Sequence, residues 1–288
     1  MKLTFLGTGT SIGVPAIGCQ CEVCRSNNPK DKRLRASAIV ESDEGLRVLI
    51  DCGPDFRQQI LRYPFKKIDA VLITHIHYDH VGGADDLRPF ALFGDVDVYA
   101  QQDVIDGLHQ TMPYCFKKEL YPGVPHLHLH EIHANNPFHV LRPHDITVKF
   151  PPSGATIEGV MNKNWHTETI PAIKEKLTIL PIRVMHGNLP ILGYKIGNMA
   201  YITDMKRIDD DSVAQIKGTE VLVVNALRFE KEHHSHQLVN DAIEFSNRVG
   251  AKRTYLTHLT HDIGTHDIAN SRLPEGFEFA YDGQEIEF

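Results

Sequence analysis

Short apolar runs bounded by glycine, proline or charged residues recur along the chain and predict strands buried on both faces. We expect strands at residues 2–7, 37–41, 46–51, 70–74, 96–100, 178–184, 193–196, 200–203, 221–224 and 253–257. Apolar residues with helical spacing predict helices at residues 84–93, 104–110, 209–216 and 237–249. This alternation predicts the α/β class, with helices packed outside the sheet.

Between about residues 111 and 175 the periodicity gives way to prolines, histidines and irregular polar residues. Such stretches usually form lids, inserts or binding loops on a rigid frame. We therefore interpret residues 1–288 as a single domain with an irregular insertion at about 111–175. We expect its histidines to be solvated loop residues or to line a substrate mouth. The alternation at positions 126, 128 and 130 equally fits one exposed face of a strand. The histidines of the insertion are His126, His128, His130, His133, His139 and His144.

Composition narrows the classes of protein that the chain can represent. The chain has 288 residues, of which 42% are apolar, and this is enough for a sizeable core. Its first residues lack the basic and long apolar segments of a signal peptide, and nothing approaches a membrane-spanning length. The net charge of -7 argues against a protein that coats nucleic acid. We expect a cytoplasmic protein and leave open whether it forms a homodimer.

The segment His75-Ile76-His77-Tyr78-Asp79-His80 follows an apolar strand and carries three imidazoles and a carboxylate. These ligand types suit zinc and neighbouring first-row ions. In an extended or turn backbone, His75 and His77 point the same way and can face one ion, which leaves Asp79 and His80 for a second. Later predicted strand ends supply three further candidate ligands: His186, Asp204 and His258.

Together, the motifs at residues 74–80, 184–187, 202–204 and 256–258 resemble the successive signatures of the metallo-β-lactamase superfamily. The resemblance extends from residue 2 to about residue 281. It implies a four-layer αββα sandwich with two divalent metal ions at one edge of the paired sheets. The resemblance assigns seven ligands: His75, His77 and His186 to the first ion, Asp79, His80 and His258 to the second, and Asp204 to both.

The same family pattern implies two further roles. Asp79 is the family's usual candidate for handling the proton of the metal-bound water. Asp51 matches the first acidic motif, and we expect it to orient histidine ligands through hydrogen bonds. The alternative for Asp51 is a strand-end residue that caps the turn at Gly53. The ligand types admit zinc, manganese, iron or nickel.

Three cysteines within six residues, Cys19, Cys21 and Cys24, form a second candidate metal site. A structural zinc site needs a fourth ligand, and His261, three residues after His258, is well placed to supply it. The alternative is that these are reduced thiols and that His261 is a solvated turn residue. The cysteine pattern after Gly-Thr-Gly-Thr, with a distal Thr-His-Leu-Thr-His, is similar to the phosphoribosyl cyclic phosphodiesterase branch of the superfamily, which carries an extra structural zinc.

The phosphodiesterase branch has a histidine that contacts the substrate phosphate, and His236 matches it better than His234. A histidine at a helix start lies where phosphate is also attracted, although ordinary helix capping is the alternative. We therefore expect two metal ions to activate water for hydrolysis of a small or cyclic phosphodiester. The alternatives are a thioester or lactone hydrolase on the same fold and a non-catalytic, metal-dependent nucleotide-binding protein. A nucleic-acid substrate is not expected, because no clear lysine and arginine block is present.

Overall fold

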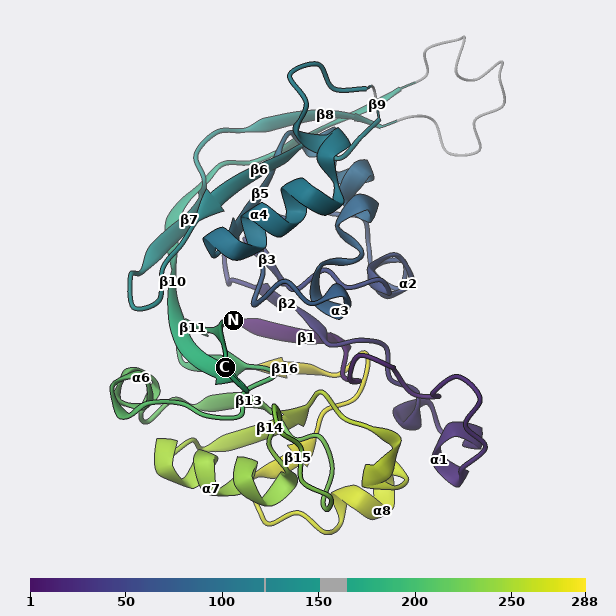
Figure 1. The fold of residues 1–288 in the computed structure, drawn as a ribbon. Helices are drawn as coiled ribbons and strands as arrows, with labels where there is room; N and C mark the ends of the chain where they lie inside the picture. Colours follow the sequence, from purple (N-terminus) through teal and green to yellow (C-terminus); the bar gives the residue numbers. More distant parts are fainter. Residues whose placement is uncertain (122, 151–164) are drawn as a thin grey trace.

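Two seven-stranded sheets form the centre of the molecule in the computed structural model, which describes residues 1–121, 123–150 and 165–288 (Figure 1). The first sheet runs in the order β16 (Glu285–Glu287), β1 (Lys2–Gly7), β2 (Ser37–Glu41), β3 (Arg47–Ile50), β4 (Ala70–Leu72), β5 (Val96–Ala100) and β6 (Leu127–Glu131). The second runs in the order β15 (Phe277–Phe279), β14 (Arg253–Thr257), β13 (Val221–Asn225), β12 (Met199–Ile202), β11 (Leu189–Ile196), β10 (Ile173–His186) and β7 (Phe138–Arg142). A separate pair joins β8 (Ile146–Phe150) to β9 (His166–Ile170).

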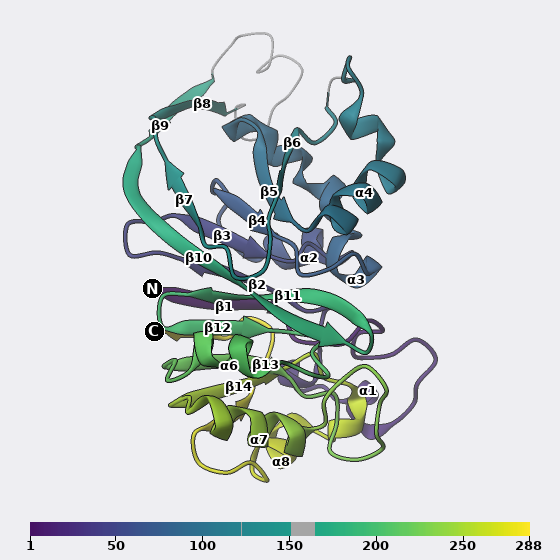
Figure 2. The ribbon, with the colours of Figure 1, turned by 60° about the vertical axis from the view of Figure 1, so that its left-hand side comes forward.

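Helices lie outside the two sheets, and short helical turns complete the connections (Figures 1 and 2). Those on the side of the first sheet are α2 (Phe56–Ile60), α3 (Tyr78–Val81), the 3₁₀ helix η2 (Ala84–Phe93) and α4 (Gln102–Thr111). Those on the side of the second sheet are α6 (Asp210–Ile216), α7 (Val239–Val249) and α8 (His266–Asn270). The remaining turns are α1 (Glu22–Arg25), η1 (Pro29–Asp31), η3 (Pro113–Phe116) and η4 (His261–Ile263).

Alternate residues of a strand pack into different cores, which explains why central strands such as β4 and β13 are apolar at nearly every position. In β3, Val48 and Ile50 belong to the cluster between the two sheets, whereas Leu49 packs with the helices outside the first sheet. Successive side chains of a strand point to opposite faces, so a sheet covered on both sides needs apolar residues at every position. The predicted αββα sandwich is confirmed by this arrangement.

The prediction of an irregular insertion at 111–175 is wrong for those of its residues that the structure describes; residues 122 and 151–164 lie outside the description. Strand β6 extends the first sheet and β7 extends the second, while β10 curves along the molecule from β7 toward β11 (Figure 2). Leu127 and Leu129 pack against the helix-side core of the first sheet. The alternation at positions 128 and 130 therefore belongs to a strand, the alternative to the expected loop.

The boundaries of the predicted helices shift only slightly, and one helix changes type. Residues 84–93 form a 3₁₀ helix that contains Pro89, which has no backbone N–H to donate. Helix α6 begins one residue after Asp209, because the side chain of Asp209 caps it by accepting from the backbone N–H of Ser212. In the described part of the chain, no helix is long and apolar enough to cross a lipid bilayer.

Candidate metal centre

The loops that follow strands of both sheets meet at one edge of the sandwich. Strands β3, β4 and β5 are parallel, as are β12, β13 and β14, so their carboxyl ends lie together within each sheet. Two hydrogen bonds join the sheets beside this edge: Leu192 N–H donates to Thr74 O (3.0 Å) and the Tyr194 hydroxyl donates to Ile73 O (2.6 Å). Four strand ends contribute predicted ligands here: His75 after β4, His186 at the end of β10, Asp204 after β12 and His258 after β14.

One group of imidazoles contains His75, His77 and His186. Nε2 of His75 lies 3.0 Å from Nδ1 of His77, and the ring centroid of His186 is 5.6 and 5.1 Å from those of His75 and His77. Nδ1 of His186 donates to the backbone carbonyl of Asp204 (2.8 Å), which leaves Nε2 free to act as a ligand. Burial lowers the pKa of His75 well below its usual value, so its imidazole is neutral at pH 7.

A second group contains Asp79, His80 and His258. The Oδ2 atom of Asp79 lies 3.4 Å from Nε2 of His80 and 3.6 Å from Nε2 of His258. Burial alone would raise the pKa of Asp79, but hydrogen bonding and charge from the two neighbouring imidazoles hold it below its usual value. Asp79 is therefore a carboxylate at neutral pH.

Asp204 lies between the two groups and is almost fully buried. Its Oδ2 is 3.3 Å from Nε2 of His80 and accepts a hydrogen bond from Thr203 Oγ1 (2.7 Å), while its Oδ1 is 3.1 Å from Nε2 of His258. Burial alone would raise the pKa of Asp204, but His258 and His80 hold it well below its usual range. Ligand atoms of His75 and His186 also lie within 4.8 Å of a carboxylate oxygen of Asp204, so this carboxylate can serve both groups.

Asp51 orients His80 from behind. Its Oδ2 accepts from Nδ1 of His80 (2.7 Å), and its Oδ1 accepts from the backbone N–H of Thr74 (2.8 Å). The first contact fixes the tautomer of His80 with the proton on Nδ1, so that the lone pair of Nε2 faces the centre.

Three residues of the centre have a left-handed backbone that non-glycine residues seldom adopt. The φ angles are 60° at Asp51, 56° at Asp204 and 56° at His258. Such conformations cost of order 1 kcal/mol or more each, and they cluster at functional sites. Asp51 and His258 directly follow strands and Asp204 lies two residues beyond β12, so the unusual backbone occurs where the chain turns away from the sheet.

His236 reaches the centre from the loop before α7. Its Nε2 lies 2.9 Å from Oδ1 of Asp204, and its ring stacks on His258 with centroids 4.9 Å apart. Burial lowers the pKa of His236 to about 4, so the ring is neutral at pH 7. A neutral ring still carries one N–H, and His236 can donate it into the centre.

The neighbours of His236 have different roles from those the sequence indicated. The ring of His234 lies tilted against that of His233 with centroids 4.5 Å apart, and among the described residues none of the side-chain hydrogen bonds at the centre involves His234. His233 was not identified from the sequence, yet its Nδ1 lies 3.0 Å from Nδ1 of His236, and Ser235 Oγ lies 3.1 Å from the same atom. The spacing of three residues between His233 and His236 was the sequence signal that could have indicated this contact.

The donor set of this centre fits a pair of divalent cations. Among the described residues, Nε2 of His80 and both ring nitrogens of His258 are buried without a hydrogen-bond partner. Buried polar atoms normally have hydrogen-bond partners. Ring nitrogens that lack such a partner and lie beside carboxylates therefore fit a site that binds a cation. Neutral imidazoles with ionised carboxylates are the donors that first-row divalent ions prefer.

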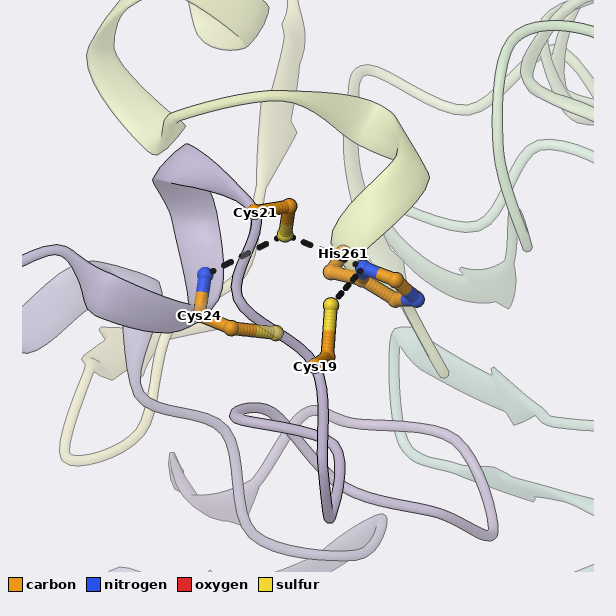
Figure 3. Close-up of side chains that lie close together, drawn as sticks. All are labelled: Cys19, Cys21, Cys24 and His261. Atoms are coloured by element: carbon orange, nitrogen blue, oxygen red, sulfur yellow. Dashed lines mark hydrogen bonds between the residues drawn. The ribbon is translucent and has the colours of Figure 1, made fainter.

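The predicted cysteine site also comes together (Figure 3). The sulfur atoms of Cys19 and Cys21 lie 3.5 and 3.2 Å from Nδ1 of His261, and Cys24 approaches the same space, so one atom from each side chain lies within 4.8 Å of the others. Burial slightly opposes ionisation of Cys21, but hydrogen bonds from Cys24 N–H and His261 lower its pKa to about 6. A thiolate is therefore available at neutral pH. Three sulfurs and one imidazole match a four-coordinate structural zinc site.

Comparison with known proteins agrees with this geometry. A family model described as a β-lactamase superfamily domain matches residues 46–259. A diphosphatase from the PhnP family, known from its crystal structure, is 35% identical, with a TM-score of 0.79 over 100% of this chain and 96% of that chain. An octanoyltransferase of Porphyromonas gingivalis is 41% identical over 285 residues, which are 99% of this chain but 51% of the relative, so the chain spans about half of that protein. Zinc-bound PqqB from Methylobacterium extorquens shares the fold, with a TM-score of 0.67 at 18% identity over the full length of both chains.

The family model covers most of the chain, and the PhnP-family diphosphatase matches it nearly end to end at an identity above 30%. Side chains at the centre described above form three overlapping groups that could hold a metal ion: His75 with His80 and Asp204, Asp79 with His80 and His258, and His186 with Asp204 and His236. The chain therefore belongs to the metallo-β-lactamase superfamily of hydrolases, in its PhnP branch.

Proposed function

We propose that this protein hydrolyses a small or cyclic phosphodiester with the help of two divalent cations. The observation that carries the proposal is the position of Asp204, whose carboxylate lies within 4.8 Å of ligand atoms of His75 and His186 in one group and of His80 in the other. His75, His77 and His186 would hold one ion, Asp79, His80 and His258 the other, and Asp204 both. Two such ions lower the pKa of coordinated water and neutralise charge on a phosphoryl group.

Side chains of the chain itself prepare the reaction. Asp79 is ionised and can accept the proton that the attacking water loses. The N–H of His236 is aimed into the centre and can donate a hydrogen bond to a non-bridging phosphoryl oxygen or to the departing alkoxide. Removing one such positioned donor to a developing oxyanion typically costs about 100- to 1,000-fold in rate. His233 and Ser235 contact the other ring nitrogen of His236 and hold this orientation.

The choice of a phosphoryl substrate is supported by the neighbour that is a diphosphatase of the PhnP family. A fold alone hosts many reactions, so this support comes from an identity of 35% across the chain and from His236 rather than from the sandwich.

We also propose that zinc in the cysteine site anchors the glycine-rich loop beside the centre. Thr10 N–H donates to Leu259 O (3.1 Å), and Leu259 directly follows the ligand His258.

The test measures hydrolysis of bis-p-nitrophenyl phosphate, a lactone and an acyl thioester by the zinc-, manganese- or nickel-loaded protein. The proposal predicts that the phosphodiester is cleaved with the highest kcat/KM. It also predicts that His236→Ala slows a phosphodiester with a poor leaving group by at least 100-fold while metal content stays unchanged. Preferred cleavage of an acyl substrate would contradict the proposal, and an unchanged rate would remove His236 from the mechanism.

A second candidate is hydrolysis of an acyl thioester in the same centre. One observation favours it: the octanoyltransferase of Porphyromonas gingivalis matches 99% of this chain at 41% identity. The matching part is about half of that relative, so its transferase activity can belong to the other half. Hydrolysis of octanoyl thioesters that exceeds phosphodiester cleavage would select this candidate.

A further inference from the structure

A cluster of two histidines and an aspartate lies outside the metal centre, on strands β5 and β6 at one end of the first sheet. Strands β5 and β6 are parallel, and their register pairs Asp97 with His128 and Tyr99 with His130. The four side chains therefore share one face of the sheet. Tyr99 packs against the core between the two sheets, so this is the inner face, where β6 ends the first sheet and β7 ends the second in the described part of the chain (Figure 1).

Both imidazoles converge on a single carboxylate oxygen. Nδ1 of His128 lies 3.0 Å and Nε2 of His130 lies 2.7 Å from Oδ1 of Asp97. The two rings are neighbours, with centroids 4.2 Å apart. The ring of His130 also stacks on Tyr99 at 4.5 Å and 14°, which restricts its rotation.

We propose that Asp97, His128 and His130 bind a divalent transition-metal ion, such as zinc, in a third site distinct from the catalytic centre and the cysteine site. Two imidazole nitrogens and one carboxylate oxygen form a three-ligand set of the kind that zinc proteins complete with water. Ligands about 2.0–2.1 Å from a tetrahedral ion lie roughly 3.3 Å apart, so small shifts of the Asp97 carboxylate suffice to admit an ion. One atom of each residue already lies within 4.8 Å of the other two.

The position of the cluster makes it accessible and separates it from the catalytic ligands. The side chains of His128 and Asp97 are 62% and 40% exposed, so an ion can enter from solvent. Leu72, the last residue of β4 before His75, pairs in register with Tyr99 of β5. Asp97 precedes Tyr99 by two residues and therefore lies further from the edge that holds the catalytic ligands. An ion bound here would join β5 to the terminal strand β6 rather than take part in the reaction.

The competing explanation is that the histidines only donate hydrogen bonds to Asp97. An Asp97→Asn substitution separates the two, because an amide oxygen still accepts a hydrogen bond whereas a neutral amide is a poor ligand for a divalent ion. Replacing His128 or His130 removes one of the three ligands. His139→Ala is the matched control, because His139 is an exposed histidine of β7 that contacts Thr178 and not this cluster.

The experiment starts from full-length protein whose catalytic and cysteine sites are already saturated, and titrates Zn²⁺ by isothermal calorimetry. The proposal predicts one further equivalent in the wild type and in His139→Ala, and at least tenfold weaker binding in Asp97→Asn, His128→Ala and His130→Ala. Cu²⁺ added to the same holoprotein should give an electron paramagnetic resonance spectrum with nitrogen couplings from two imidazoles. Absence of a further equivalent in the wild type, or equal affinity in all five proteins, would overturn the proposal.

Discussion

Replacing Asp51 by asparagine should weaken the binding of one of the two catalytic metal ions more than that of the other. Asp51 is fully buried and accepts from Nδ1 of His80 at 2.7 Å. With its amide nitrogen at this position, the asparagine would favour the other tautomer of His80, in which Nε2 carries the proton and cannot bind a metal. If the amide flips instead, the hydrogen bond survives but the negative charge that makes His80 a stronger donor is lost.

The expected magnitude follows from the role of such hydrogen bonds behind metal ligands. Their loss typically weakens metal affinity 10- to 100-fold, which corresponds to about 1.4–2.7 kcal/mol. The backbone adds little to this effect, because Asp51 has a φ of 60° and asparagine tolerates the left-handed region well. The ion held by Asp79, His80 and His258 should be affected more than the other, because Asp51 contacts His80 directly and reaches His75 only through the hydroxyl of Thr74.

The assay titrates fully loaded protein with a chromophoric chelator and follows the release of each equivalent. Asp51→Asn should release one equivalent at a lower chelator concentration than the wild type, and phosphodiesterase activity should fall with it. Asp103→Asn, at an exposed position of α4, is the matched control for the loss of a carboxylate. Equal retention of all equivalents in Asp51→Asn and the wild type would refute the proposed role of this hydrogen bond.

Three further predictions concern other parts of the molecule. Cys21→Ser should lose one zinc equivalent while the two catalytic ions remain; unchanged zinc content would exclude the cysteine site. Gly53→Ala should destabilise the fold by about 1–3 kcal/mol, because a Cβ there would overlap the carbonyl oxygen of Asp79, and an unchanged denaturation midpoint would contradict this. Burial and the nearby Arg33 lower the pKa of His266 to about 4 in the folded protein. In the unfolded chain its pKa returns to about 6.5, so the protein takes up a proton when it unfolds at a pH between 4 and 6.5. Stability should therefore fall by of order 2 kcal/mol as the pH drops from 6.5 to 4, and His266→Gln should flatten this part of the pH profile measured by urea denaturation.

The apolar runs predicted the buried strands well, whereas the sandwich itself was implied by the resemblance to the metallo-β-lactamase superfamily. Covering both faces of a sheet requires this pattern, and the runs at residues 37–41 and 70–74 carry it clearly. The prediction favoured a loop at β6, whereas the structure has the alternative, a strand, with His128 and His130 on the inner face of the first sheet at its β6 end. Strand alternation was present there, but polar residues on one face and few apolar residues on the other resemble a loop.

The composition of the metal centre could be predicted, whereas its fine positioning could not. Predicted ligands such as His75, Asp204 and His258 follow strands, and parallel strands bring such residues to one edge. Nothing in the sequence indicated the left-handed backbone at Asp204 and His258, because it depends on tertiary packing. The contact between His233 and His236 also depends on how the loop before α7 folds back onto Asp204.

The most direct test of the account is the number and position of metal ions at Asp204. Crystals of the protein loaded with zinc, measured at the zinc absorption edge, would locate each ion by its anomalous scattering. The account predicts one peak among His75, His77 and His186 and a second among Asp79, His80 and His258, with Asp204 contacting both. A single peak at this centre, or imidazoles that turn away from it in the loaded protein, would contradict the account.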